Sequence, residues 1–221
     1  MKKIISAFAL FLATAISSVP TTQAGETILL PKDQEIQLAL AAAPEQVRAG
    51  ASIYVYGRDG YHKARGGTNG FTCLLNRDGN QNGDNFLKPT CWDPEGTRTI
   101  VPVVLRVGQL LASSTSAAQI KREIDAGFAS GKFMSPRRTG IAYMLRGDLL
   151  FDPKTQRITK TAFPPHYMIY APGVSNADIG TAVQDPSGKF VLPGVYAGYS
   201  GGERTAYIIV LAAPSSLLPT S

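Results

Sequence analysis

Apolar residues recur at helical spacing in two segments of the chain. Asp33 precedes the run QEIQLALAAA, and an acidic residue in front of such a run is typical of a helix N-cap. Further along, Ser116 precedes AAQIKREIDAGF, in which apolar residues recur every three or four positions while charged residues occupy the other face. We predict two main helices, the first ending or restarting at Pro44 and the second ending at Gly131.

Short runs rich in β-branched and aromatic residues, separated by glycine, proline and asparagine, are typical of strands. We predict strands at residues 51–56, 61–65, 71–75, 99–107, 141–145, 149–151, 167–170 and 206–212. Pro102 interrupts the fourth run, which indicates an edge position, whereas the last run is continuously apolar and should lie centrally in a sheet. Few helices, many short strands and no regular βαβ alternation predict an α+β fold with a largely antiparallel sheet.

The first 24 residues carry the three zones of a secretory signal peptide. Two lysines precede an apolar run from Ile4 to Val19, and small residues follow up to Ala24, after which we expect cleavage. The run is shorter than the roughly 20 apolar residues that span a bilayer, and we expect no transmembrane segment after cleavage. We therefore expect a periplasmic or secreted protein in which residues 25–221 form a single domain with a frayed tail at about 214–221.

Cys73 and Cys91 are the only two cysteines. An exported chain meets an oxidising compartment, so we expect them to form a disulfide bond. The disulfide would close the stretch from Gly66 to Pro102, which also holds the only tryptophan, as an Ω-type loop. The alternative is a zinc site that joins the cysteines to His62 and His166, but the sequence lacks the closely spaced ligand pairs of structural zinc sites.

Several strings in the chain are similar to those of a known family. They are GTNGFTCL (67–74), CWDPEGTRTI (91–100), GIAYML (140–145), PPHYMIYAP (164–172) and NADIG (176–180). These strings resemble a family of uncharacterised exported bacterial proteins, and the likeness covers most of the chain after the signal peptide. The resemblance implies export and a shared fold, and it transfers no catalytic residue.

One polar loop matches the first half of a calcium-binding loop. Asp78, Asn80, Asn82 and Asp84 place oxygen side chains at alternate positions, with a glycine at the sixth position for the turn. Position 12 should be a bidentate glutamate and is Pro89, and no predicted helix flanks the loop. We interpret the segment as a solvated loop tip, with calcium binding as the alternative.

His62 and His166 are the only histidines, and histidine is the side chain that moves protons near neutral pH. Asp93, Glu95 and Arg98 follow the second cysteine, so a disulfide would hold two carboxylates and a guanidinium in place. An enzyme of the hydrolase type would use His166 with Glu95 or Asp93. The structural alternatives are a hydrogen-bonded histidine and a salt-bridged turn.

Two further patterns are typical of a metal site and of a serine nucleophile. His166 and Met168 fall on one face of an extended segment, a pair that suits copper, with His62 or Met144 as a third ligand. The string from Gly198 to Gly202 fits G-x-S-x-G, the turn that exposes a serine nucleophile. No histidine lies downstream of it and a predicted strand follows, so we interpret this string as a glycine-rich turn.

The formal net charge is +6, but the basic residues are scattered instead of forming a stripe interleaved with aromatics, which argues against nucleic-acid binding. We expect an exported binding or accessory protein of the cell envelope, without a cofactor, whose ligand is a small molecule or an envelope partner. The alternatives are a small hydrolase and a copper-handling protein. If the protein has a functional pocket, we expect His166 to line it together with residues 93–98.

Overall fold

A computed structural model describes residues 28–182, 184, 191–198 and 200–212. The predicted signal peptide and the predicted frayed tail lie outside these residues. Within them the chain forms helices and a mostly antiparallel sheet of ten strands, which confirms the α+β prediction. None of the helices in the described ranges combines the length and the apolar composition that crossing a bilayer requires.

The helices are α1 (Lys32–Ala41), α2 (Glu45–Arg48), α3 (Pro94–Thr99), α4 (Val101–Ala112) and α5 (Ala117–Ala129), with the 3₁₀ turns η1 (Asn80–Asn82) and η2 (Gly202–Thr205). The first strands are β1 (Ser52–Gly57), β2 (Gly60–Arg65), β3 (Thr72–Asn76), β4 (Phe86–Trp92) and β5 (Ile141–Met144). The others are β6 (Asp148–Asp152), β7 (Arg157–Phe163), β8 (His166–Tyr170), β9 (Gly194–Tyr196) and β10 (Tyr207–Leu211).

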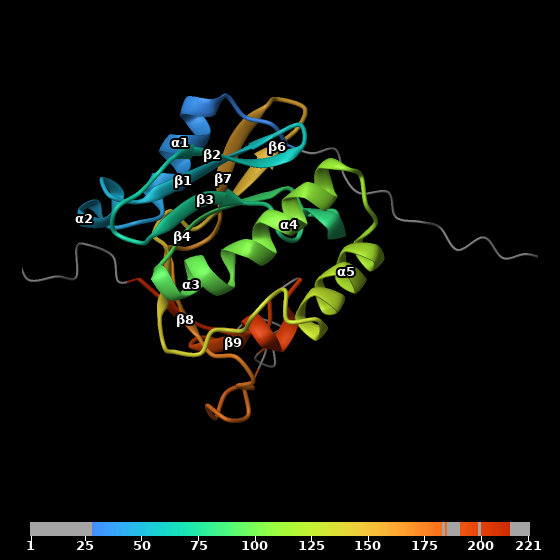
Figure 1. Cartoon of the computed structure of the whole chain (residues 1–221). Helices are drawn as coiled ribbons and strands as arrows, with labels where there is room; N and C mark the ends of the chain where they lie inside the picture. The colour runs from blue at the N-terminus through green and yellow to red at the C-terminus, as the bar shows by residue number, and fades with distance from the viewer. Residues whose placement is uncertain (1–27, 183, 185–190, 199, 213–221) are drawn as a thin grey trace, which may run out of the picture.

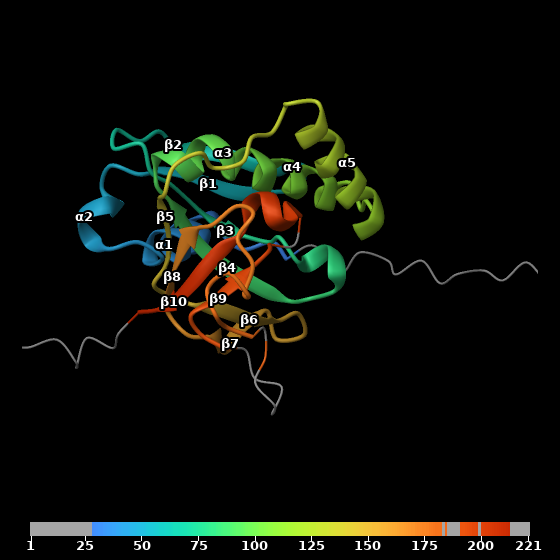
Figure 2. The same cartoon turned by 90° about the horizontal axis from the view of Figure 1, so that it is seen from below.

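The main path of the sheet runs β2-β1-β3-β4-β5-β8-β10-β9, and among the described strands the β1–β3 pair alone is parallel. Off this path, β6 pairs with β4 and with β7. Helices cover both faces of the sheet, because α1 lies on one side while α3, α4 and α5 lie together on the other (Figure 1). Figure 2 shows the same separation from below, with the β6–β7 hairpin on the side away from α4.

Alternation along β4 divides its side chains between two cores. Trp92 packs in a cluster with residues of α4, whereas the neighbouring Cys91 packs with Ala39 of α1. Because residues two apart in a strand share a face, Lys88 and Thr90 lie on the same face as Trp92. The face of β4 that turns toward α4 therefore carries polar side chains at one end and an aromatic ring at the other.

The edge of β4 that meets β5 and β6 is split. Residues 91–92 pair with β5 and residues 86–87 pair with β6, with Pro89 between the two pairings. Proline has no N–H to donate, which suits an interruption in the strand ladder. Thr90 Oγ1 donates to the carbonyl oxygen of Lys88 at 2.9 Å, so this carbonyl has a local partner. The ladder along this edge of β4 is therefore interrupted at residues 88–90.

A buried ion pair joins the end of β3 to α1. Arg77 Nη1 lies 2.7 Å from Glu35 Oε1, and Nη2 lies 2.9 Å from Oε2, with both residues fully buried. Arg77 Nε also donates to the carbonyl oxygen of Ile28 at 3.0 Å. A bidentate pair fixes both partners in orientation, so it also fixes the neighbouring Asn76 and Asp78.

Several predicted features are confirmed. The two predicted helices are α1 and α5, and Ser116 Oγ caps α5 by accepting from the backbone N of Gln119 at 3.4 Å. The predicted cap at Asp33 is wrong, because α1 begins at Lys32 after Pro31 and Asp33 lies in its first turn. Gly131 follows α5 with a φ of +75°, a backbone conformation that favours glycine. The last strand, β10, lies between β8 and β9, as its apolar sequence predicted.

The prediction of a strand at residues 99–107 is wrong, because Thr99 ends α3 and residues 101–107 lie in α4. Pro102 lies in the first turn of α4, where its missing N–H costs no intrahelical hydrogen bond. The buried positions of α4 recur at helical spacing: Val103, Val104, Val107, Leu110 and Leu111. Burial of this face outweighs the strand preference of the valines. The domain therefore has three long helices where the sequence predicted two main ones.

The predicted disulfide between Cys73 and Cys91 is present, but it does not close an Ω-type loop. The two cysteines lie opposite each other across β3 and β4, and both are fully buried against α1. The stretch from 66 to 102 therefore contains a cross-linked hairpin followed by α3. The bond also rules out the alternative of a zinc site with free cysteine ligands.

Candidate functional site

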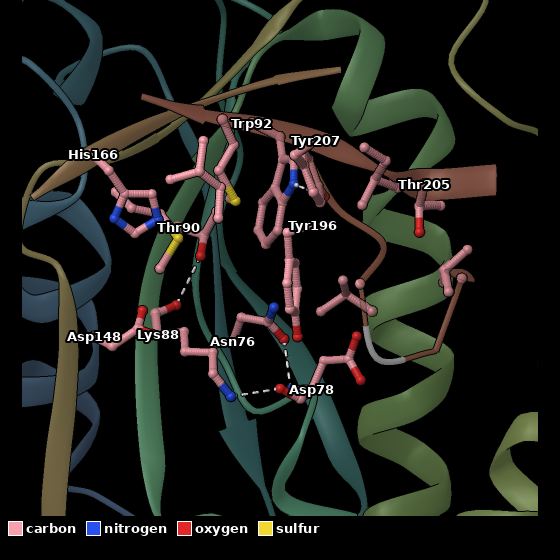
Figure 3. A pocket seen from close by; sticks show the side chains of 18 of the residues that line it. Asn76, Asp78, Lys88, Thr90, Trp92, Asp148, His166, Tyr196, Thr205 and Tyr207 are labelled. Carbon is pink, nitrogen blue, oxygen red and sulfur yellow. Dashed lines mark hydrogen bonds between the residues drawn. The ribbon is translucent and has the colours of Figure 1, made fainter. Parts of the chain in front are cut away.

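A cavity of about 330 Å³ lies between α4 and the part of the sheet that contains β4, β5, β8 and β10. Figure 3 shows its lining side chains. Its apolar lining includes Trp92, Val103, Val104, Met144, Met168 and Ile209. Its polar lining includes Asp78, Lys88, Thr90, Asp148, His166 and Tyr207. An apolar cavity with a few polar groups is the usual form of a small-molecule site.

The strands supply alternate residues to this cavity. On three strands, residues that lie two apart line the cavity: Lys88, Thr90 and Trp92 on β4, His166 and Met168 on β8, and Tyr207 and Ile209 on β10. This follows from the period of two in a pleated strand. The cavity adjoins the split edge of β4, where β5 and β6 leave residues 88–90 between their two pairings.

One polar end of the cavity is internally hydrogen-bonded. Lys88 Nζ donates to the carbonyl oxygen of Asp78 at 2.7 Å and to Asp84 Oδ2 at 3.0 Å. Asp78 Oδ1 accepts from Ser200 Oγ at 2.6 Å and from Gln81 Nε2 at 2.9 Å. These charges have partners within the protein, so this end of the cavity is held in one arrangement.

Asp148, the first residue of β6, has a different environment. Its Oδ1 atom is buried and has no hydrogen-bond partner among the described residues. Burial raises the pKa of the Asp148 carboxyl to about 6. The positive charge of Lys88 opposes this shift in pKa, and the negative charge of Asp84 adds to it. A buried carboxylate oxygen without a partner is costly for the free protein, and the carboxyl group to which it belongs is on a residue that lines the cavity.

His166 presents a second acceptor. Its Nδ1 lies 2.8 Å from the carbonyl oxygen of Pro164, and because a carbonyl can only accept, Nδ1 carries the proton. Burial lowers the pKa of His166, which the bond to Pro164 only partly opposes, so the ring is neutral near pH 7. Nε2 then carries a lone pair and has no partner among the described residues. The ring packs edge-to-face on Phe163, with 4.9 Å between centroids.

Figure 3 shows how these groups are arranged. His166 and Asp148 project into the cavity from one side, and Thr205 lies on the opposite side. The rings of Trp92 and Tyr207 lie between them, and Trp92 Nε1 donates to the hydroxyl of Tyr207 at 3.3 Å. The two acceptors without partners and the aromatic surface therefore border the same space.

The structure does not bring His166 together with Asp93. Asp93 caps α3, its Oδ1 accepting from the backbone N of Gly96 at 2.9 Å and from the Tyr170 hydroxyl at 2.8 Å. Its Oδ2 accepts from the backbone N of Ile141 at 3.0 Å. Tyr170 is four residues from His166 along β8, or roughly 13 Å at the rise of an extended strand.

Glu95 has partners of its own. It is 3% exposed, and its Oε1 accepts from the backbone N of Arg137 at 2.7 Å. Its other oxygen pairs with Arg98 and, at 3.5 Å, with Arg138. Residues 93–98 are absent from the lining of the His166 cavity. His166 lines the cavity with Asp148 and not with Glu95 or Asp93, so the prediction that a pocket joins His166 to residues 93–98 is wrong. The structure does not support a hydrolase site that pairs His166 with Glu95 or Asp93. The contacts of residues 93–98 fit the alternative of a salt-bridged turn.

His62 does not meet His166. It lies on β2 beside Asp59, and four strands separate β2 from β8 in the sheet. His62 therefore cannot share a copper or zinc site with His166. Met144, in contrast, pairs with His166 across β5 and β8, and both line the cavity together with Met168.

The loop from Asp78 to Asp84 is more ordered by contacts than a solvated tip. Asn80 and Asn82 bound the turn η1, and Gln81 between them is only 5% exposed. The carboxylates of Asp78 and Asp84 accept hydrogen bonds from protein donors. In the part of the chain described here, no group of three or more histidine, cysteine or acidic side chains is placed to hold a metal ion.

Ser200, the serine of the G-x-S-x-G string, is buried and donates to Asp78. The chain continues through η2 into β10, as the interpretation of a turn before the last strand predicted. Sequence reasoning did not single out Asp148, Lys88, Thr90 or Trp92 as site residues. The signal for three of them was the alternation in KPTCW, which Pro89 obscured.

Comparison of the chain with models of protein families, with curated proteins and with solved structures found no match. A function must therefore be inferred from the chemistry of the cavity. Its apolar walls and its two acceptor atoms without partners suit the binding of an organic molecule that is larger than a single ion.

Proposed function

We propose that the protein is an exported binding module that holds a small organic molecule in the cavity between α4 and the sheet. The single observation that carries this proposal is the buried Oδ1 of Asp148, which lacks a partner among the described residues at the wall of an apolar cavity. A protein gains nothing in stability from such an atom, whereas a ligand donor would satisfy it.

The proposed location is the periplasm or the extracellular space. It is supported by the N-terminal pattern of charged, apolar and small residues and by the disulfide between Cys73 and Cys91, since disulfides persist in oxidising compartments. N-terminal sequencing of protein recovered outside the inner membrane should begin at Gly25. Recovery of the full chain from the cytoplasm alone would contradict this location.

Trp92 provides a direct test of binding, because it is the only tryptophan and lines the cavity. We expect 4-phenylbutanol, which has an apolar body and one hydrogen-bonding end, to change the emission of Trp92 in a saturable way. It should also raise the melting temperature, since a ligand that binds only the native state stabilises it.

Two variants at Val104, which lines the cavity from α4, make the test specific. Val104→Phe should fill the cavity and abolish the saturable change while the protein remains folded by circular dichroism. Val104→Ala should enlarge the cavity and keep the response, at a stability cost of about 1–3 kcal/mol. An identical response in all three proteins would place the probe elsewhere and contradict the proposal.

A second function, copper(I) binding, is favoured by one specific observation. Met144 lies directly across from His166 in the β5–β8 ladder, and both line the cavity with Met168. Thioethers and a neutral imidazole nitrogen are ligands that copper(I) accepts. Competition with a chromophoric copper(I) chelator tests this function. Unchanged affinity in a Met144→Leu, Met168→Leu double variant would eliminate it.

A further inference from the structure

The polar groups of the cavity differ in whether the protein itself satisfies them. Lys88 is held by the Asp78 carbonyl and the Asp84 carboxylate, and the Asp78 carboxylate accepts from two side chains. Asp148 Oδ1 has no partner in the described chain. Neutral His166 has a lone pair at Nε2 that no described residue uses. Of the carboxylate and imidazole groups that line the cavity, Asp148 and His166 each keep an acceptor atom that no described residue uses, and a ligand that brings hydrogen-bond donors complements both.

The charge around the remaining acceptors favours a cation. The charges of Lys88 and Asp84 act on the pKa of Asp148 in opposite directions, and these two residues form an ion pair with each other at 3.0 Å. Lys88 is therefore shared between two carboxylates, and it only partly compensates the charge of Asp148 when that carboxyl is ionised. A donor that also carries positive charge would supply both the hydrogen bond and the counter-ion.

The size and the walls of the cavity indicate the rest of the ligand. Its volume of about 330 Å³ is roughly twice that of a cavity known to hold benzene, at about 150 Å³, which allows a body of about a dozen non-hydrogen atoms. The walls beside the acceptors include Trp92 and Tyr207. Aromatic faces accommodate both an apolar body and a nearby ammonium group.

We propose that the cavity binds a small primary ammonium ion with an apolar or aromatic body, and that Asp148 pairs with the ammonium group while His166 Nε2 offers a second acceptor. This inference rests on the proposed binding function and adds to it the chemical class of the ligand. Neither a carboxylate ligand nor a simple alcohol would supply both donors and positive charge to this wall of the cavity.

The affinity for such a ligand should depend on pH in a defined direction. An alkylammonium stays protonated well above neutral pH, so Asp148 controls the response. Its carboxyl has a pKa of about 6, hence ammonium binding should strengthen as the pH rises from about 5 to about 7.5. Protonation of His166 at low pH would act in the same direction. The Lys88–Asp84 pair adds no net charge while both partners are ionised.

Three probes with the same body separate the ligand classes: 4-phenylbutylamine, 4-phenylbutanol and 4-phenylbutyrate. Titrations followed by Trp92 emission at about pH 7.5 should show the amine binding about tenfold or more tightly than the alcohol, as expected for a charged hydrogen bond, and the carboxylate binding most weakly. At about pH 5 the advantage of the amine over the alcohol should shrink toward one.

Asp148→Asn supplies the decisive variant, because it keeps the shape of the side chain and removes its charge. The amine should lose its advantage in this variant while the alcohol still binds. Asp152→Asn is the matched control, since Asp152 lies on the same strand outside the cavity and should leave all three affinities unchanged. Equal binding of amine and alcohol by the unmodified protein would overturn the ammonium inference and leave the binding function standing. Binding of none of the probes would overturn both.

Discussion

Asp148 and His166 are the two residues that distinguish this cavity from an ordinary gap in a core. Each is held by its strand at the cavity wall, and each keeps an acceptor atom without a partner in the described chain. In most proteins a buried polar atom finds a partner, and exceptions concentrate where a ligand or a reaction requires them. The effect of such an atom on the free energy of unfolding can be measured without knowing the ligand.

Replacement of Asp148 by asparagine should stabilise the free protein at neutral pH. The folded-state pKa of about 6 is above the unfolded value near 3.8, so the folded protein binds the proton more tightly. Ionisation therefore destabilises the fold progressively as the pH rises from about 4 through 6. We expect Asp148→Asn to raise the free energy of unfolding by about 1–3 kcal/mol at pH 7.5 and by much less at pH 4. Denaturant titrations at both pH values check this, and a pH-independent difference would refute it.

Two variants of His166 should distinguish what its ring packing and its hydrogen bond to Pro164 each contribute to stability. His166→Ala removes a ring that is 2% exposed and packs on Phe163, so it should cost about 2–4 kcal/mol. His166→Asn can keep the hydrogen bond to the Pro164 carbonyl through its amide N–H while removing the Nε2 acceptor, so it should cost less stability. Thermal melts give the stabilities. An asparagine variant as unstable as the alanine variant would mean that this hydrogen bond contributes little.

Sequence reasoning could identify His166 as a pocket residue because histidine is rare in this chain and follows two prolines. It could not find Asp148, because an aspartate in front of an apolar run also fits the turn before a strand. Asp93 and Glu95 seemed equally suitable in the sequence. Only the fold shows that backbone amides, Tyr170 and arginines already use their oxygens.

Among the elements, β4 and α4 form two walls of the cavity, and neither was predicted correctly. Lys88 and Pro89 gave the segment of β4 the composition of a loop, and valines gave the start of α4 the composition of a strand. Tertiary packing decides both cases, since residues 88–92 of β4 pair with β3 and α4 buries one helical face. Elements with clear periodicity and end signals, such as α5, were predictable from the sequence alone.

The disulfide should contribute measurable stability to the β3–β4 pair. Cys73 and Cys91 are 18 residues apart in sequence, and a cross-link of that span is worth about 3 kcal/mol in the chain-entropy model. For a domain of this size, replacement of both cysteines by alanine should lower the melting temperature by roughly 6–12 °C. Mass spectrometry of the unreduced protein serves as the control. Two free thiols in exported protein would contradict the cross-link.

At the scale of the whole molecule, the two faces of the sheet differ in how they are packed. One face, with α1, the disulfide and the Glu35–Arg77 ion pair, is closely packed and holds the strands in register. The other face carries the cavity, under α4 and beside the split edge of β4. A closely packed face behind the cavity suits the proposed binding, because a preorganised site loses little conformational entropy when a ligand binds.

The most direct test of the central claim is a methionine-methyl NMR titration with 4-phenylbutylamine. Of the four methionines, Met144 and Met168 line the cavity, while Met134 is 38% exposed after α5 and serves as an internal control. Binding in the cavity predicts saturable shifts of the Met144 and Met168 methyl resonances, with that of Met134 unmoved. Unchanged resonances for Met144 and Met168, or equal shifts of all three, would contradict the claim that this cavity is the binding site.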